Sequence, residues 1–210
     1  MVEAKICGIK DAAALDAALD GGARYVGFVV YPKSPRHVSR DQLATLAARA
    51  RGRAETVVVT VEADDEVLAA LAAYAQPDWI QLHGHESPGR VANAARYAQR
   101  GVIKALGVAR SEDLAQASAY EPVADVLMFD AKPPEGGMPG GNALAFDWAI
   151  LAGRRFSRPW FLSGGLNPGN VREAITASGA GLVDVSSGVE AAPGLKDPAL
   201  IAQFLAAARA

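Results

Sequence analysis

The chain has 210 residues, half of them apolar, and a formal net charge of −2, so it is long enough to bury a substantial core. Because the charges nearly balance and no run of Lys or Arg occurs, we expect neither nucleic acid nor an anionic membrane as a partner. A single cysteine excludes an intramolecular disulfide framework, and without a signal-peptide pattern or an apolar run near the ~18 residues that cross a bilayer, we expect a cytoplasmic protein.

Strand-like and helix-like segments alternate along the whole chain. Short runs rich in Val, Ile and Phe predict strands over 4–7, 25–30, 56–61, 79–83, 102–108, 126–131, 160–164 and 182–188. Segments that follow them predict helices over 11–20, 39–51, 64–75, 87–99, 111–119, 146–153, 168–178 and 197–209. Capping residues support several of the helix starts: Asp11, Ser39, Asn167 before Pro168, and Asp197 before Pro198.

Eight βα units without a linker predict an α/β protein of one domain, a (β/α)8 TIM barrel over residues 1–210. The rival architecture is an open doubly wound sheet, which would want a glycine-rich GxGxxG fingerprint after its first strand. The stretch "CGIKDAAAL" has no such fingerprint. In a barrel of this kind, the active site is expected at the C-terminal ends of the strands and in the loops that follow them.

Two of these strand ends predict a phosphate site. "SGGLNPGN" places Gly164 and Gly165 between a strand and a helix, and "SSGVE" offers Ser186, Ser187 and Gly188 at the next strand end. Glycine lets backbone N–H groups approach a phosphate closely, and the loops after strands seven and eight are the recurrent phosphate site of this fold. The alternative is that these glycines serve tight turns only.

Two residues could carry acid–base chemistry. Asp130 ends an apolar strand, where burial would favour the protonated form of a general acid; it could equally be a capping or ion-paired aspartate, with Lys132 as one candidate partner. Cys7 could be a small buried apolar residue, which position alone favours. At the C-terminal end of a barrel strand, however, it would face helix N-termini that favour a thiolate.

Other polar residues at the strand ends also have two interpretations. Arg36 could grip a carboxylate with its planar fork or be a solvated loop residue, and Asp184 could accept a hydrogen bond from a substrate or pair with Lys5. His83 and His85 with Glu86 are a weak metal signal because no third ligand matches them, so we expect no metal and interpret His83 as a hydrogen-bonded inner-face histidine.

Together these motifs resemble the phosphoribosylanthranilate isomerase family of tryptophan biosynthesis, over the whole length of the chain. The matching stretches are "KICGI", "GFVVYPKSPRHVS", "QLHGHE", "FDAKP", "GGNALAFDW", "LSGGLNPGNV" and "VDVSSGVEAAPGLKD". They occur in the order of the family and at compatible spacing, and an end-to-end set of seven is highly specific.

The resemblance implies an aldose–ketose isomerase that converts N-(5-phosphoribosyl)anthranilate to 1-(2-carboxyphenylamino)-1-deoxyribulose 5-phosphate by an Amadori rearrangement, without a cofactor. It implies Cys7 as the general base and Asp130 as the general acid, with Arg36 on the anthranilate carboxylate and Asp184 near the anthranilate amine. The phosphate contacts that it implies are Gly164, Gly165, Ser186, Ser187 and Gly188. The expected partner is thus a small phosphosugar, and we expect a monomer or a homodimer.

One departure concerns the loop after the sixth strand. The family usually reads GGxG before "FDW", whereas here Ala143 stands where glycine is expected and "PPEGGMPGG" lengthens the loop. We therefore expect a change in the hinge of any lid formed there, with the catalytic positions untouched.

Three rival functions remain in view. A histidine-pathway aminoaldose isomerase would use paired aspartates, and Cys7 occupies the first of those positions. A ribulose-phosphate epimerase would want metal ligands from several strands, which the sequence does not supply. A non-catalytic barrel that only binds phosphate would be favoured by loss of Cys7 or Asp130, and both are present.

Overall fold

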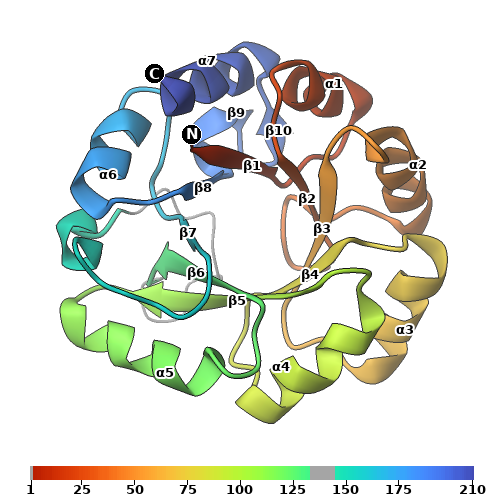
Figure 1. Cartoon of the computed structure of the whole chain (residues 1–210). Helices are drawn as coiled ribbons and strands as arrows, with labels where there is room; N and C mark the ends of the chain where they lie inside the picture. The colour runs from red at the N-terminus through yellow and green to blue at the C-terminus, as the bar shows by residue number, and fades with distance from the viewer. Residues whose placement is uncertain (1, 133–144) are drawn as a thin grey trace.

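The computed structural model describes residues 2–132 and 145–210, and its centre is a closed barrel of parallel strands paired in sequence order (Figure 1). The strands are β1 (Glu3–Cys7), β2 (Tyr25–Val29), β3 (Glu55–Thr60), β4 (Trp79–Leu82), β5 (Gly101–Val108), β6 (Val126–Ala131), β7 (Trp160–Leu162) and β8 (Leu182–Val185). Pairing of β1 with β8, in which Lys5 is the register partner of Asp184, closes the barrel. The predicted (β/α)8 barrel is therefore confirmed.

Helices surround the barrel on its outside (Figure 1). The α-helices are α1 (Ala12–Asp20), α2 (Arg40–Ala50), α3 (Asp65–Tyr74), α4 (Pro88–Ala94), α5 (Ala117–Tyr120), α6 (Val171–Ser178) and α7 (Pro198–Arg209). In the part of the chain that the structure describes, the short 3-10 helices are η1 (Ala95–Tyr97), η2 (Ser111–Gln116), η3 (Trp148–Leu151) and η4 (Ser187–Val189). A two-stranded antiparallel hairpin of β9 (Glu190–Ala192) and β10 (Leu195–Lys196) follows the barrel.

Side-chain caps fix where several helices begin. Asp11 accepts a hydrogen bond from the backbone N–H of Ala14, and Ser39 forms a reciprocal capping box with Gln42. Asp197 caps α7 ahead of Pro198, so these three predicted starts are confirmed.

The structure corrects the sequence prediction at several places. The helix predicted over 111–119 is the 3-10 helix η2 followed by the one-turn α5, and the strand predicted over 182–188 ends at Val185. The helix predicted over 168–178 begins later, at Val171, because the Asn167 side chain instead accepts a hydrogen bond from the N–H of Gly169 in a preceding turn. The helix predicted over 146–153 is only the one-turn η3, which Asp147 caps and the left-handed Gly153 follows. The hairpin of β9 and β10 was not predicted.

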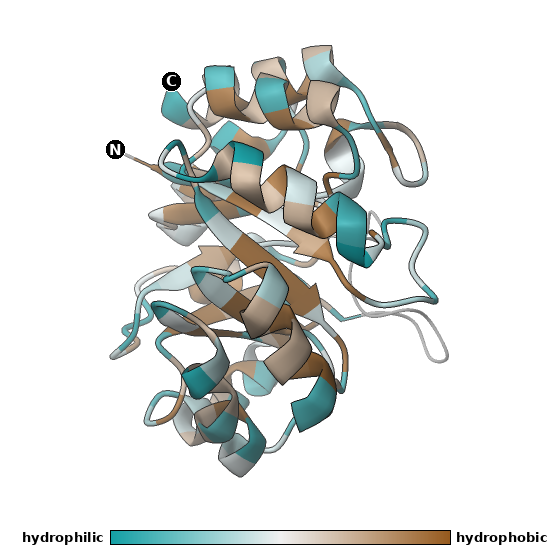
Figure 2. Cartoon of the chain, turned by 90° about the vertical axis from the view of Figure 1, so that its right-hand side faces the viewer, coloured by the Kyte–Doolittle hydropathy of each residue, from teal (hydrophilic) through white to brown (hydrophobic). Residues whose placement is uncertain are grey.

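Apolar residues pack in two layers, one inside the barrel and one between strands and helices. The inner layer includes Cys7, Val57, Ile103, Met128 and Phe161, all buried. Figure 2 shows apolar residues along the strands at the centre of the molecule and polar residues on the outer helices. Within residues 2–132 and 145–210, no helix is both long enough and apolar enough to cross a bilayer.

Candidate active site

The floor of the site is a buried cluster at the join between β1 and β8. Lys5 is fully buried, and its Nζ lies 2.8 Å from Oδ1 of Asp184. Ser163, just after β7, donates to Oδ2 of the same carboxylate at 3.2 Å. Of the two interpretations of Asp184, the structure realises the pairing with Lys5, and the carboxylate oxygens keep lone pairs for a further donor.

Cys7 is next to this cluster, at the C-terminal end of β1, and is 6% exposed. A Cβ placed on Gly27 of β2 would lie 3.0 Å from Sγ of Cys7 and 3.2 Å from Cε of Lys5, so the thiol and the lysine stem converge on one point. Burial raises the pKa of the Cys7 thiol, the Lys5 cation opposes that rise, and the Asp184 carboxylate adds to it. The net result is a raised pKa, so the protein without substrate does not favour the thiolate that the sequence predicted at this strand end, and the ionisation of Cys7 depends on the Lys5–Asp184 pair.

The same group of charges acts on Lys5. Burial alone would lower the pKa of Lys5, but the carboxylate of Asp184, together with Cys7 in its thiolate form, outweighs burial and raises that pKa. Lys5 is therefore a buried ammonium at neutral pH.

Asp130 lies at the C-terminal end of β6 and is 6% exposed. Its Oδ2 lies 3.1 Å from Nε2 of His83, whose Nδ1 lies 2.8 Å from Nε2 of Gln81. The suggested partner Lys132 instead has its Nζ 4.0 Å from Oδ1 of Asp113. Asp130 is thus held by a histidine across the barrel mouth, and His83 is a hydrogen-bonded inner-face histidine as predicted.

Arg36 is buried rather than solvated, at 7% exposure, in the loop between β2 and α2. Its Nε and Nη2 donate to the two carboxylate oxygens of Glu190, each at 2.8 Å. Lys196 approaches Oε1 of the same carboxylate at 2.7 Å and also donates to the backbone oxygen of Ser186 at 2.9 Å. The sequence analysis did not predict Glu190 and Lys196 as site residues. The signal that could have indicated them is the pair of opposite charges on either side of "AAPGL", after "SSGV".

The loops after β7 and β8 carry the five residues predicted for a phosphate site. Gly164 adopts a left-handed backbone, and a Cβ there would lie 2.6 Å from the backbone N of Ala131. Among the described residues, the N–H groups of Gly164 and Gly165 have no hydrogen-bond acceptor. The short helix η4 begins at Ser187, as the extra helix of a barrel phosphate site does.

Backbone contact between these two loops is close. A Cβ on Gly188 would lie only 1.9 Å from the backbone oxygen of Leu166, so only glycine fits there. Ser186 donates from Oγ to the backbone oxygen of Cys7 at 3.1 Å, which joins the β8 loop to the end of β1. The five predicted phosphate residues therefore lie on two loops that touch each other.

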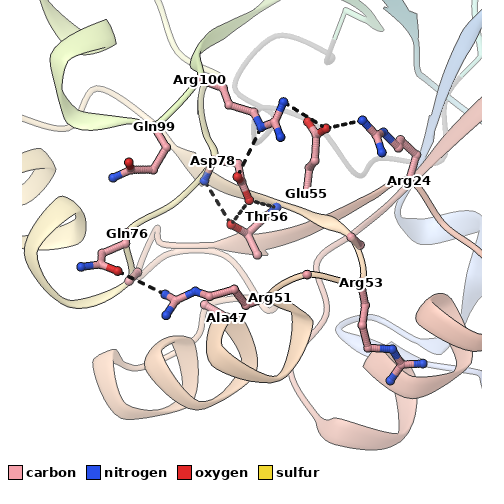
Figure 3. A pocket seen from close by; sticks show the side chains of 13 residues that line it. Arg24, Ala47, Arg51, Arg53, Glu55, Thr56, Gln76, Asp78, Gln99 and Arg100 are labelled. Atoms are coloured by element: carbon pink, nitrogen blue, oxygen red, sulfur yellow. Dashed lines mark hydrogen bonds and ion pairs between the residues drawn. The ribbon is translucent and has the colours of Figure 1, made fainter.

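A separate cavity of about 470 Å³ opens at the other end of the barrel, where strands begin (Figure 3). Its arginines are occupied: Arg24 and Arg100 pair with Glu55, and Arg51 donates to Gln76. None of the predicted site residues lines this cavity. In (β/α)8 barrels the active site lies at the opposite end, where the strands have their C-termini.

The described residues contain no group of three or more His, Cys, Asp or Glu side chains that could hold a metal ion. Glu86, which the sequence placed beside His83 and His85, instead lies 2.8 Å from the buried Nζ of Lys104. The departure at Ala143 and the stretch "PPEGGMPGG" lie outside the described residues.

Known proteins match the chain end to end. The family described as N-(5'-phosphoribosyl)anthranilate (PRA) isomerase matches residues 4–207. A relative of that name from Caulobacter vibrioides is 55% identical over 208 residues, which is 98% of this chain and 95% of the relative. The crystal structure of phosphoribosyl anthranilate isomerase from Thermotoga maritima is 38% identical, covers 100% of this chain and 99% of its own, and superposes with a TM-score of 0.89.

A further solved structure of this kind contains a ligand. It is phosphoribosyl anthranilate isomerase in complex with reduced 1-(o-carboxyphenylamino)-1-deoxyribulose 5-phosphate. It is 36% identical, covers 100% of this chain and 99% of its own, and has a TM-score of 0.86.

Proposed function

The chain belongs to the N-(5'-phosphoribosyl)anthranilate isomerase family of tryptophan biosynthesis, and from that premise we propose that Cys7 and Asp130 perform its aldose–ketose rearrangement as general base and general acid. The observation that carries the proposal is a buried thiol and a buried carboxyl at the C-terminal ends of β1 and β6. These strands are separated by β7 and β8 in the barrel order, so the two groups reach the mouth from different sides.

The reaction starts at the sugar ring. Protonated Asp130 gives its proton to the furanose ring oxygen, the bond from that oxygen to C1′ breaks, and a Schiff base forms between C1′ and the anthranilate nitrogen. The Cys7 thiolate then takes the proton from C2′. The electrons of that bond form the enolamine, which tautomerises to the ketone of 1-(2-carboxyphenylamino)-1-deoxyribulose 5-phosphate.

The remaining site residues hold the two ends of the substrate. The phosphate binds to two loops, which carry Gly164 and Gly165 in one and Ser186, Ser187 and Gly188 in the other. Two observations support this assignment: Gly164 and Gly165 have left-handed backbones, and their N–H groups have no acceptor among the described residues. Arg36 contacts the anthranilate carboxylate, and Asp184 accepts from the anthranilate amine. Holding both ends fixes the sugar between base and acid, which replaces orientation entropy that solution chemistry must supply.

The same proposal covers the domain, the oligomeric state, the location and the cofactor requirement of the protein. We infer one isomerase domain over residues 1–210, in a monomer or homodimer, that acts in the cytoplasm on a small phosphosugar. We propose that it needs neither a cofactor nor a metal and binds no nucleic acid.

Purified protein should convert phosphoribosylanthranilate without added metal or cofactor, and loss of substrate fluorescence follows the reaction. Cys7→Ala should abolish turnover while product still binds, because the phosphate loops remain intact. Unchanged turnover in Cys7→Ala would sink the proposed mechanism. Binding of product without turnover by the unaltered protein would instead favour a non-catalytic barrel.

The assignment of Arg36 has its own test. Arg36→Ala should act mainly on KM, because a ground-state contact to the carboxylate is lost. Lys33→Ala is the matched control, since Lys33 is an exposed cation in the same loop, and it should leave both constants unchanged. An effect of Arg36→Ala confined to kcat would contradict a ground-state carboxylate contact.

A further inference from the structure

The hairpin of β9 and β10 brings a buried carboxylate to Arg36. Glu190 accepts four hydrogen bonds: Oε1 from Arg36 Nε at 2.8 Å and Lys196 Nζ at 2.7 Å, and Oε2 from Arg36 Nη2 at 2.8 Å and the N–H of Gly194 at 3.2 Å. The side chains of Arg36, Glu190 and Lys196 are only 8%, 4% and 1% exposed. Every strong acceptor position of the carboxylate is therefore used inside the protein.

This carboxylate is too well bound to leave when a substrate arrives. Burial raises the pKa of Glu190, but Arg36 and Lys196 outweigh burial and lower that pKa, so the carboxylate is ionised at neutral pH. Expelling an ionised group from four buried donors would leave two cations without their partner. A substrate carboxylate must therefore meet Arg36 while Glu190 keeps the edge formed by Nε and Nη2.

The hairpin also fixes where the guanidinium stem lies. A Cβ on Gly194 would lie 2.4 Å from the backbone oxygen of Pro35, so the hairpin turn lies directly on the loop that carries Arg36. A Cβ on Gly8 would lie 2.7 Å from Cδ of Arg36, so the arginine stem crosses the chain right after Cys7. The hairpin thus holds Arg36 beside the residue assigned as the general base.

We propose that Glu190 is a positioning residue that makes the enzyme selective for substrates whose aromatic ring carries a carboxylate, by holding the Arg36 guanidinium in one orientation through the bidentate pair at Nε and Nη2. The inference rests on the proposed function, because it needs Arg36 to contact that carboxylate. Lys196 secures Glu190 from the other side and also joins it to the β8 loop through Ser186. Glu190 carries one negative charge and pairs with two cations, Arg36 and Lys196, so the group keeps a net positive charge. That charge attracts a second carboxylate that binds at Arg36.

Without Glu190, the guanidinium would lose its bidentate anchor and regain rotamer freedom. Binding the substrate carboxylate would then have to restrict that freedom, which raises KM but leaves proton transfer at C2′ unchanged. The effect should vanish for a substrate that has no ring carboxylate, because Arg36 then has nothing to hold.

The test compares phosphoribosylanthranilate with the matching phosphoribosylaniline, which differs only in lacking the ring carboxylate. The variants are Glu190→Ala, Glu190→Gln, Arg36→Ala and the double variant of Arg36→Ala with Glu190→Ala. Glu173→Ala serves as the control, because Glu173 is an exposed glutamate on α6.

For the carboxylate substrate, Glu190→Ala should raise KM about tenfold, which corresponds to about 1.4 kcal/mol, with kcat within about twofold of the unaltered enzyme. For the aniline substrate, neither constant should change. In the Arg36→Ala background, removal of Glu190 should add nothing, because the two residues act as one unit. Should Glu190→Ala fail to fold, Glu190→Gln, which keeps the shape and loses the charge, decides by the same comparison.

The proposal is overturned if Glu190 variants affect both substrates equally, if they lower kcat alone, or if their effect adds fully to that of Arg36→Ala. Failure of the underlying function gives a different pattern. In that case the unaltered protein does not turn over phosphoribosylanthranilate, or Arg36→Ala itself does not discriminate between the two substrates.

Discussion

Replacing Lys5 by Met tests whether the buried lysine sets the ionisation of Cys7. The side chain of Lys5 is completely buried, and Asp184, its partner at 2.8 Å, is 6% exposed as a side chain. Methionine has similar length and no charge, so the substitution removes the cation without opening a large cavity. It leaves the Asp184 carboxylate buried with Ser163 as its remaining partner in the cluster.

The expected loss of stability is large. Removing one member of a buried ion pair costs about 3–5 kcal/mol, because the other charge is left uncompensated. For a domain of this size, about 1 kcal/mol lowers Tm by roughly 2–4 °C, so Lys5→Met should melt roughly 6–20 °C below the unaltered protein. The double variant with Asp184→Asn should recover much of that loss, because no unpaired charge remains.

The effect on chemistry follows from the sign of each charge. Burial raises the pKa of Cys7 and the Lys5 cation opposes the rise, so Lys5→Met should raise the pKa further. Less thiolate is then present at neutral pH, and each pH unit by which the profile moves costs about tenfold in kcat/KM below that pKa. Asp184 acts in the opposite sense, so the double variant should titrate between Lys5→Met and the unaltered protein.

The titration of Cys7 can be measured without interference from other thiols, because Cys7 is the only cysteine of the chain. Ultraviolet absorbance of the thiolate, recorded against pH with Cys7→Ala as the reference for tyrosine ionisation, reports its titration directly. The pH dependence of kcat/KM should move with it toward alkaline pH. If Lys5→Met melts as expected but Cys7 titrates where it did before, the lysine is structural only and the link between the pair and the base is refuted.

Three further predictions concern the acid, the phosphate loops and a buried ion pair. Asp130→Asn should lower kcat by several powers of ten with product still bound, measured by single-turnover fluorescence and calorimetry; near-normal activity would remove it as the acid. Gly188→Ala should weaken the affinity for inorganic phosphate at least tenfold, because the new Cβ would lie 1.9 Å from a backbone oxygen and would displace the loop. The control Gly89→Ala should leave the affinity unchanged, because no atom lies within 4 Å of a Cβ there. Equal affinities of the two variants would contradict the phosphate assignment. Burial raises the pKa of Glu86, but Lys104 and the N–H of Glu62 outweigh burial and lower that pKa. Its contribution to stability is therefore present at neutral pH and is lost as the pH falls below the ordinary glutamate pKa and through the lowered pKa of the folded state. Glu86→Gln should therefore lower Tm at pH 7 and flatten its fall in acid; parallel Tm curves for both proteins would speak against this pair.

The barrel could be predicted from the sequence because it depends on local patterns. Alternating apolar strands and capped helices predict the elements, and a parallel barrel then brings every strand's C-terminal end to one mouth. The sequence alone therefore predicts that Cys7, Asp130 and Asp184 lie at that mouth. The exceptions are equally local: Asn167 caps a turn rather than α6, and a one-turn helix stands where a longer one was predicted.

The partners of these residues could not be predicted in the same way. Arg36 and Glu190 are 154 positions apart, and Asp130 and His83 are 47 apart. Which side chains meet across a barrel depends on register and on the course of the loops, which no local pattern encodes. The sequence suggested Lys132 for Asp130 because it is near in the chain, yet the barrel turns that residue toward Asp113.

The polar groups of the mouth therefore have partners before any substrate binds: Asp184 pairs with Lys5, Arg36 pairs with Glu190, and Asp130 lies 3.1 Å from the His83 ring. Each pair holds its catalytic or binding group in one orientation, so little reorganisation is needed when charge develops during the reaction. The same pairing restricts how a substrate binds, because the internal partners already use part of the hydrogen-bonding capacity of each group. Specificity in this site should therefore depend as much on Lys5, Glu190 and His83 as on the residues that touch the substrate.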